Sequence, residues 1–545
     1  MPLRAWISLT VLGLGCACTR DGTVGIVQLA SSTSEGPSST GSDDGQPTEG
    51  GRLDLATSDP EACLARGESP VPCTPDDRPD SFEAVVQWEW TGPDGNTDTL
   101  VIPLVANLTD DDGNGRVDLC DGPDIVVVAG PPPPTNLAQG IPPARLYALD
   151  GATGARHWTS ERPVRAAITP ALGDIDGDGD IEIVTLSPVG TDVAPHASNL
   201  IIFESDGRIS LLGDEAFDST AADAVALADL DADGFAEIMV ADRVFDHTGQ
   251  TLFVAPDVGL DSGEPLMPFG VDLDDDGDLE VLWARAAYHH DGTPLFANIG
   301  LRRGYAQVAD LDGDPEPEIV MTTATGLAVV EADGTIIAID VRPVDLPASS
   351  EGWRRPAAIH DIGGDARPEV LLSAGSQFLA LRVEPADGSL QEVWTDAPAV
   401  VDAGWATGTA FDFLGDGTAE AIYADEHQLY AFDETGAVLL MAERSSITLQ
   451  EYPVVADVDD DGSAEIVVGS NAGDGTAQYS TLTVYGEADD RWVQARRIWN
   501  QHTYHVTNVG EDGSLPAPER PHWRTTNTFR TNAQLEDGMV CVPVP

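Results

Sequence analysis

The sequence predicts an all-β protein, a β-propeller of eight four-stranded blades, with a seven-bladed ring as the alternative. Three observations lead to this prediction. The motif D-x-D-x-D-G-x-x-E, complete at residues 229–237, occurs eight times, whole or degraded, with starts 38 to 64 residues apart. Short β-branched apolar runs such as 224–228 and 238–240 flank the copies and indicate buried strands. Repeats of this length are typical of solenoids, propellers or arrays, and four-stranded units repeated radially form a propeller.

Four strands can be assigned to each repeat unit. In the third unit they are 222–228, 237–242, 243–246 and 251–254, and in the seventh 407–413, 420–424, 428–433 and 437–442. Asp-Gly pairs at 150–151, 206–207, 291–292 and 333–334 predict hairpin turns. A linear β-solenoid is the alternative, but its turns are shorter than these units. An extra strand at 83–90 precedes the first motif, and we expect it to join the last blade and close the ring.

The motif itself has the chemistry of a calcium loop between the first and second strands of a blade. Its carboxylates converge only if the chain curls tightly, and Gly at the sixth position permits the left-handed turn. Hard oxygen ligands in this number suit Ca²⁺. An EF-hand is excluded, because the flanks are strands and the twelfth positions of copies two to five hold Thr185, Val240, Trp283 and Met321. The alternative is that Asp and Gly only form turns, but the regular recurrence favours calcium.

The eight copies differ in completeness. Four have every ligand: Asp174, Asp176, Asp178 and Glu182; Asp229, Asp231, Asp233 and Glu237; Asp272, Asp274, Asp276 and Glu280; Asp457, Asp459, Asp461 and Glu465. The first has Asp110, Asp112, Asn114 and Asp118, with Asp121 as a second candidate for the closing ligand. The fifth has Asp310, Asp312, Asp314 and Glu318, but Pro315 replaces the Gly and fixes φ near −65°. Gly363 and Leu414 stand at the third position of the sixth and seventh copies, which we expect to be empty. The sequence thus predicts five or six calcium ions.

These loops resemble the FG-GAP and VCBS repeat family, whose best-known member is the propeller of the integrin α-subunit. The resemblance covers about residues 82–500. The literal Phe-Gly of the family is present at Phe269-Gly270, but the Gly-Ala-Pro half is missing. The resemblance implies a calcium-bearing propeller, commonly secreted or surface-exposed and often used in adhesion or recognition, rather than an enzyme.

The N-terminal residues predict export. Residues 1–18 have a charged end, a short apolar core and small residues before a cysteine, as in a bacterial lipoprotein signal. Cys16 or Cys18 would carry the lipid and place the protein at the outer membrane or cell surface; plain secretion or a periplasmic location is the alternative. Residues 19–80 are rich in Ser, Thr, Gly, Pro and Asp and predict a disordered tether, with a reach of ~35 Å for about 40 residues. Export and an even cysteine count predict the disulfides Cys63–Cys73 and Cys120–Cys541.

The composition argues against a polyanionic partner. The formal net charge is −66 and the sequence contains no Lys, so we expect neither nucleic acid nor an anionic membrane surface as a partner. Six occupied sites would neutralise about twelve charges. A salty medium, which screens self-repulsion, and simple compositional drift explain the remainder equally well. We expect a monomer.

The segment 501–545 is expected to be a tail packed on the closure of the propeller. The string W-N-Q-H-x-Y-H-x-T-N at 499–508 resembles a segment that follows such propellers in other bacterial surface proteins. His502 and His505 could bind a metal, with Glu519 and His522 as the nearby candidate ligands. Alternatively, they are hydrogen-bonded structural residues, and we favour this interpretation.

Two functions remain open. The favoured one is a surface-anchored binding or adhesion module for a protein or glycan, in which calcium stabilises the fold. The alternative is a secreted polysaccharide-cleaving enzyme resembling the rhamnogalacturonan lyases. Such a lyase should have a basic, aromatic cleft, and the pairs at 302–303, 354–355 and 496–497 are the arginine clusters. The sequence shows no nucleophile motif, and no catalytic residue is assigned.

Overall fold

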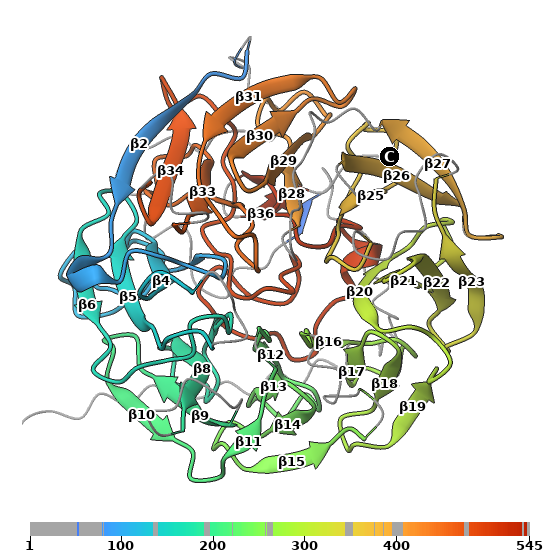
Figure 1. The fold of residues 1–545 in the computed structure, drawn as a ribbon, viewed down its shortest axis with the longest axis horizontal. Helices are drawn as coiled ribbons and strands as arrows, with labels where there is room; N and C mark the ends of the chain where they lie inside the picture. The colour runs from blue at the N-terminus through green and yellow to red at the C-terminus, as the bar shows by residue number, and fades with distance from the viewer. Residues whose placement is uncertain are drawn as a thin grey trace, which may run out of the picture. The chain divides into compact units, whose positions relative to one another are not determined.

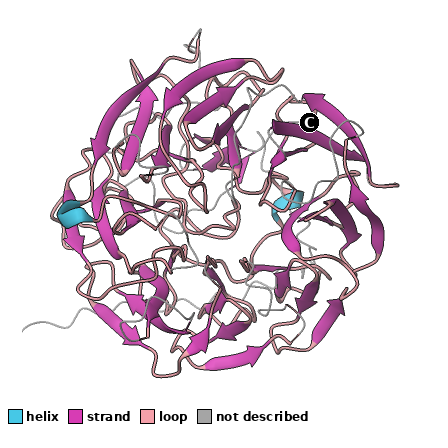
Figure 2. Ribbon diagram, in the orientation of Figure 1, coloured by secondary structure: helices cyan, strands magenta, loops and turns pink. Residues whose placement is uncertain are grey.

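The computed structural model of the chain shows a ring of eight β-sheets (Figure 1). It describes residues 81–134, 140–189, 197–220, 222–256, 265–343, 353–374, 377–384, 386–394, 407–472, 479–536 and 539–541, with the short pieces 52–53, 79 and 258. The ring is almost entirely strand and loop (Figure 2). The prediction of an all-β propeller with eight four-stranded blades is therefore confirmed. The described residues contain no helix with the length and apolar character needed to cross a membrane.

The blades follow one another in chain order. Blade 1 has β3 (Leu104–Ala106), β4 (Asp124–Ala129), β5 (Arg145–Asp150) and β6 (Arg156–Thr159). Blade 2 has β7 (Ala171–Gly173), β8 (Glu182–Pro188), β9 (Ala197–Phe203) and β10 (Ile209–Leu212), with β11 (Phe217–Asp218) paired to β9. Blade 3 has β12 (Ala226–Ala228), β13 (Glu237–Val240), β14 (Arg243–Phe245) and β15 (Thr251–Val254). Blade 4 has β16 (Phe269–Val271), β17 (Glu280–Trp283), β18 (Ala286–Tyr288) and β19 (Pro294–Ala297).

The second half of the ring repeats this order. Blade 5 has β20 (Gly304–Ala309), β21 (Glu318–Thr323), β22 (Gly326–Glu331) and β23 (Ile336–Val341). Blade 6 has β24 (Ala358–His360), β25 (Glu369–Ala374), β26 (Gln377–Glu384) and β27 (Ser389–Trp394). Blade 7 has β28 (Gly408–Phe411), β29 (Glu420–Ala424), β30 (Gln428–Phe432) and β31 (Val438–Glu443). Blade 8 has β32 (Val454–Ala456), β33 (Glu465–Gly469) and β34 (Leu482–Glu487).

The fourth strand of blade 8 comes from the start of the described chain. β2 (Ala84–Trp90) pairs antiparallel with β34, from Ala84 opposite Glu487 to Trp90 opposite Leu482. This strand covers the edge that blade 8 would otherwise expose. The expected ring closure by 83–90 is present. Three short strands, β1 (Arg52–Leu53), β36 (Met539–Cys541) and β35 (Leu535–Glu536), form a separate small sheet.

Burial follows the order of the strands in each blade. The first three strands are largely buried, whereas outer strands such as β15 and β31 alternate between exposed and half-buried residues. Apolar side chains of neighbouring blades form shared clusters, and one of them extends from blade 3 to blade 6. The core therefore lies between the blades, and each blade needs its neighbours for its apolar burial.

The glycines of the Asp-Gly hairpins also join neighbouring blades. Gly207, Gly292 and Gly334 have φ of 81°, 82° and 85°, which favours glycine. A Cβ on Gly207 would lie 2.7 Å from the ring of Trp158 on β6, and a Cβ on Gly292 would lie 2.8 Å from Phe253 on β15. Each hairpin thus presents a flat backbone surface to a large side chain on the outer strand of the preceding blade.

The segment after blade 8 lies in the centre of the ring (Figure 1). It contacts the first strand of every blade. In blade order, the contacts are Val105 with Trp499, Leu172 with Asn500, Leu227 with Gln501, Phe269 with Phe529, Val308 with His522, Ile359 with Phe529, Thr409 with Arg530, and Val455 with Asn532. We call residues 499–534 the central segment. It was expected at the ring closure, and its contacts extend from there to all eight blades.

Candidate metal centres

The eight acidic loops join the first and second strands of their blades. They are numbered here as loops 1 to 8 after the blades. Because all blades have the same strand order, the loops leave them on the same face of the ring. Backbone hydrogen bonds connect neighbouring loops, from Ala236 N–H to the Ile175 carbonyl at 3.0 Å and from Leu279 N–H to the Leu230 carbonyl at 2.8 Å. The predicted position of the loops between first and second strands is therefore observed.

Loop 3 shows how the motif folds. The Asp229 carboxylate accepts the N–H groups of Asp233 at 3.1 Å and Gly234 at 2.8 Å. The closing Glu237 accepts the Leu230 N–H at 2.9 Å. Gly234 has φ of 92°, as the sixth position requires. These bonds curl the loop so that oxygens of Asp229, Asp231 and Glu237 lie within 4.8 Å of one another.

Several loops bring their predicted ligands together in the same way. One oxygen from each of Asp174, Asp176 and Glu182 in loop 2, and from each of Asp110, Asp112 and Asp121 in loop 1, also lie within 4.8 Å. In loop 4 the corresponding group is Asp274, Glu280 and His289. His289 was not among the ligands predicted from the sequence; it directly follows β18 and contacts Glu280 at 2.8 Å.

Burial and mutual repulsion disfavour charge on the closing glutamates in the absence of an ion. Burial, with smaller effects from neighbouring aspartates, raises the pKa of Glu182, Glu237 and Glu318 to about 8. The pKa of Glu280 is raised to about 7, again mainly by burial. A bound cation would reverse this repulsion by favouring the charged carboxylates.

Loop 8 is the most deeply enclosed of the complete loops. Burial raises the pKa of both Asp457 and Glu465 well above their usual values, and neighbouring aspartates raise them further. Oδ1 of Asp457 and Oδ1 of Asp459 are buried and have no hydrogen-bond partner among the described residues. Unsatisfied buried carboxylate oxygens are costly. The donor set, all hard oxygens, fits Ca²⁺, so these residues are suited to hold the ion that the motif predicts.

An arginine occupies the corresponding place in loop 6. Arg382, which lies across from Glu369 on β26, contacts Glu369 and also Asp365 at 3.1 Å. Glu369 is fully buried and Arg382 is 14% exposed. The guanidinium supplies the positive charge that an ion would supply elsewhere. The sequence predicted an empty loop 6 from Gly363 alone and did not identify this side chain.

Loop 7 keeps Asp412, Asp416 and Glu420 but has Leu414 at the third position. Burial raises the pKa of Asp412 to about 6 and that of Glu420 to about 8. A protonated Glu420 removes one charge from this loop at neutral pH. Without a carboxylate at the third position, loop 7 also brings one negative charge fewer together than a complete loop.

Loop 1 is longer than the other loops, and its closing residue is an Asp rather than a Glu. Asp124, the first residue of β4, accepts the Leu108 N–H at 3.0 Å, as Glu237 accepts the Leu230 N–H in loop 3. Asp121 accepts the N–H groups of Asp111, Asp112 and Asp118. Asp124 thus occupies the structural position of the closing Glu, and Asp121 provides the oxygen near Asp110 and Asp112. The motif pattern pointed to Asp118 or Asp121 as the closing ligand and gave no indication of Asp124.

Loop 5 has lost one of the bonds that curl the chain. Pro315 has no N–H, so Asp310 cannot receive the bond that Gly234 donates to Asp229 in loop 3. Other contacts hold the loop, because Asp310 exchanges hydrogen bonds with the Asn527 side chain and the Pro315 carbonyl accepts Arg524 Nε at 3.0 Å. The central segment therefore supports loop 5.

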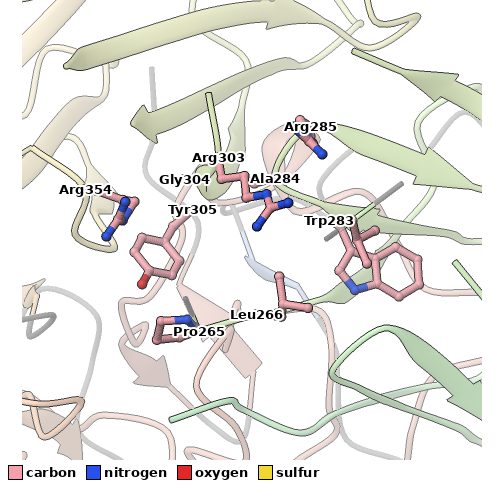
Figure 3. A pocket seen from close by; sticks show the side chains of 10 residues that line it. Pro265, Leu266, Trp283, Ala284, Arg285, Arg303, Gly304, Tyr305 and Arg354 are labelled. Carbon is pink, nitrogen blue, oxygen red and sulfur yellow. The ribbon is translucent and has the colours of Figure 1, made fainter. Parts of the chain in front are cut away.

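The described residues line hollows on both faces of the ring. On the face opposite the acidic loops, Trp283, Arg285, Arg303, Tyr305 and Arg354 line a cavity of about 20 Å³ (Figure 3). On the acidic face, a hollow of about 430 Å³ lies between loops 5 and 6. Its lining includes Asp310, Asp312, Arg367, Glu384, Ala386 and Asn527.

The predicted disulfides can be tested only in part. Cys120 is disulfide-bonded. The side chains of the other five cysteines lie outside the described residues, so the pairs Cys120–Cys541 and Cys63–Cys73 stay predictions. The predicted signal segment and most of the predicted tether also lie outside the described residues.

Comparisons with known proteins agree on the fold. No family model matches the chain, and no curated protein matches it by sequence. Among solved structures, it is similar to the V. cholerae biofilm matrix protein Bap1, with a TM-score of 0.65 and 21% identity over 85% of this chain and 100% of that chain. It is also similar to the rhamnogalacturonan lyase YesW, with a TM-score of 0.50 and 16% identity over 86% of this chain and 83% of that chain. Likeness at these identities shows the propeller fold alone.

Proposed function

We propose that the chain is an exported, calcium-binding β-propeller of the FG-GAP and VCBS type that acts as a binding or adhesion module for a protein or glycan. The observation that carries the calcium proposal is loop 8, where Asp457 and Asp459 have buried oxygens without a hydrogen-bond partner among the described residues. Loops 1 to 5 and loop 8 are the proposed sites. Loop 6 has Arg382 instead, and loop 7 has Leu414 in place of the carboxylate at the third position.

The sizes of the two hollows favour binding over cleavage. A cavity of about 20 Å³ holds roughly one water molecule, so the arginine-lined cavity has no room for a sugar ring. The hollow of about 430 Å³ between loops 5 and 6 has the size of an ordinary ligand site. We therefore place ligand binding on the acidic face. The arginine and aromatic lining of the smaller cavity is the one observation that supports the lyase alternative.

Calcium binding is tested by counting ions and removing one site. Equilibrium dialysis of the wild-type protein should give five or six bound calcium ions per chain. Asp231→Ala should reduce this number by one, whereas Asp365→Ala in loop 6 should not change it. A wild-type protein that binds no calcium at millimolar concentration would contradict the proposal.

Ligand binding is tested with a glycan array probed by calcium-loaded protein, together with an assay for unsaturated lyase products. We expect binding without product formation. Ala386→Trp should fill the hollow and abolish binding, and Ala297→Trp on the exposed strand β19 is the control. Unsaturated product formed by the wild type would establish the enzyme instead, and binding unaffected by Ala386→Trp would place the ligand elsewhere.

The proposed location is the outer membrane or the cell surface, through a lipid on Cys16 or Cys18. Mass spectrometry of the N-terminal peptide from the native host would show the lipid and identify the modified cysteine. An unmodified mature N-terminus would support secretion or a periplasmic location.

A further inference from the structure

Three potential metal ligands of the central segment meet inside the ring. One ligand atom from each of His505, Glu519 and His522 lies within 4.8 Å of the other two. His505 and His522 are each 1% exposed, and Glu519 is 9% exposed. The two imidazole centroids are 4.5 Å apart, and Phe529 packs against both rings. The sequence analysis paired His502 with His505, whereas the structure groups His505 with His522.

Backbone carbonyls fix which nitrogen of each ring has a lone pair for a metal ion. Nδ1 of His505 lies 3.0 Å from the Thr503 carbonyl, and Nε2 of His522 lies 2.9 Å from the Val308 carbonyl. Because a carbonyl only accepts, each of these nitrogens carries the hydrogen. The other two nitrogens, Nε2 of His505 and Nδ1 of His522, then have the lone pairs for a metal, and an ion would displace the hydrogen that lies between Nε2 of His505 and Oε1 of Glu519 in the metal-free protein. Metal-binding histidines almost always donate their other N–H in this way.

Glu519 completes the group and is itself held in place. Its Oε1 lies 2.7 Å from Nε2 of His505 and accepts the hydroxyl of Thr507 at 2.8 Å. Around a tetrahedral ion with bonds of about 2.0–2.1 Å, ligand atoms are separated by roughly 3.3 Å. A small outward movement of Glu519 and a small inward movement of His522 would therefore reach that geometry.

We propose that His505, Glu519 and His522 bind one divalent transition-metal ion, zinc by ligand type, in the centre of the propeller. Two imidazoles and one carboxylate suit zinc, whereas calcium prefers oxygen ligands alone. The ion would join two parts of the central segment and, through Val308, fix them to β20 of blade 5. This site is independent of the acidic loops, and its presence does not depend on their binding calcium.

Metal analysis of the full chain tests the proposal. Protein expressed with zinc, purified without chelators and kept in excess calcium should contain about one zinc ion per chain. His522→Gln should contain none, and His247→Gln, at a histidine that stacks on Phe235 in blade 3, is the matched control. Thr507→Val removes only the hydrogen bond to Glu519 and should weaken zinc binding about 10–100-fold. Phenanthroline, which removes zinc but not calcium, should lower the melting temperature of the wild type.

A second measurement covers the case in which His522→Gln does not fold. Wild-type protein loaded with Co²⁺ should show the visible absorption of tetrahedral cobalt with nitrogen and oxygen ligands, and added zinc should remove it. Wild type that contains no transition metal, gains no cobalt spectrum and melts at the same temperature with phenanthroline would overturn the proposal. The three residues would then form only a buried His–Glu hydrogen bond.

Discussion

Removing calcium should make the stability of this propeller fall as the pH rises from 5 to 8. In a metal-free loop the folded protein keeps a proton on the closing Glu, whose pKa is about 8 in loops 2, 3 and 5. The unfolded chain releases that proton near the ordinary glutamate pKa of 4.5. The folded state therefore binds more protons than the unfolded state between these two values, and the free energy of unfolding decreases with pH over this window.

The size of the effect follows from the shifts. One pKa unit corresponds to about 1.4 kcal/mol, so each closing Glu costs the metal-free protein up to about 4 kcal/mol by pH 8. Because solvent around the exposed aspartates screens their repulsion, we expect a cost of ~2 kcal/mol for each closing Glu. Four such residues, counting Glu280, give roughly 8 kcal/mol, which is comparable to an ordinary net stability of ~5–15 kcal/mol. Calcium at ten times its dissociation constant adds about 1.4 kcal/mol per site and removes the need for the protons.

Thermal melting between pH 5 and pH 8, in calcium-free buffer and in calcium, measures this effect. The metal-free melting temperature should fall markedly across the range, whereas the calcium-loaded value should change little. Glu237→Gln should raise the metal-free melting temperature at pH 8, leave it nearly unchanged at pH 5, and lower it in calcium. Glu443→Gln, on the exposed strand β31, is the control. A metal-free melting temperature that stays level or rises towards pH 8 would refute the reasoning.

Three further changes test the site assignments. Asp231→Ala should lower the melting temperature only when calcium is present. Asp365→Ala should lower the free energy of unfolding by at most about 1 kcal/mol, because Asp365 is half exposed. Equal effects of the two substitutions in differential scanning calorimetry would contradict the distinction between loops 3 and 6. Arg382→Met should destabilise the folded protein by about 3 kcal/mol, since it leaves the buried Glu369 carboxylate without its partner. If added calcium restored the lost stability, loop 6 would bind an ion after all. Non-reducing peptide mapping should recover Cys120 joined to Cys541, and any other partner would exclude that pairing.

Much of the fold could be predicted because the signals are local. The motif sets a tight turn between two apolar runs, and Asp-Gly pairs set the next hairpin, so each blade is encoded within about fifty residues. The sequence analysis did not predict that the fourth position of each acidic loop also has a left-handed backbone. In three loops this position is held by Ala232, Asp275 and Asp460, with φ of 53°, 61° and 57°. Glycine at this position in the other five loops was the available signal.

The remaining features depend on contacts that spacing does not encode. Arg382 meets loop 6 only because the strand register places it across from Glu369. Asp124 takes the closing position only because loop 1 is longer than the motif. The central segment has no periodic pattern, and its partners lie far away along the chain, as with His522 and Val308. His505, Glu519 and His522 were all candidates from the sequence, but the sequence could not predict that these three side chains lie next to one another.

The contacts of the central segment with all eight blades set a constraint on how this protein can evolve and mature. Propellers change size when a blade is duplicated or deleted, but here a new blade would displace existing blades from their partners on a single non-repeating segment of chain. The contacts of this one short segment therefore constrain the number of blades. Because that segment follows all eight blades in the chain, the ring reaches its final packing only after the segment has been synthesised, and a nascent chain without it remains an incomplete assembly.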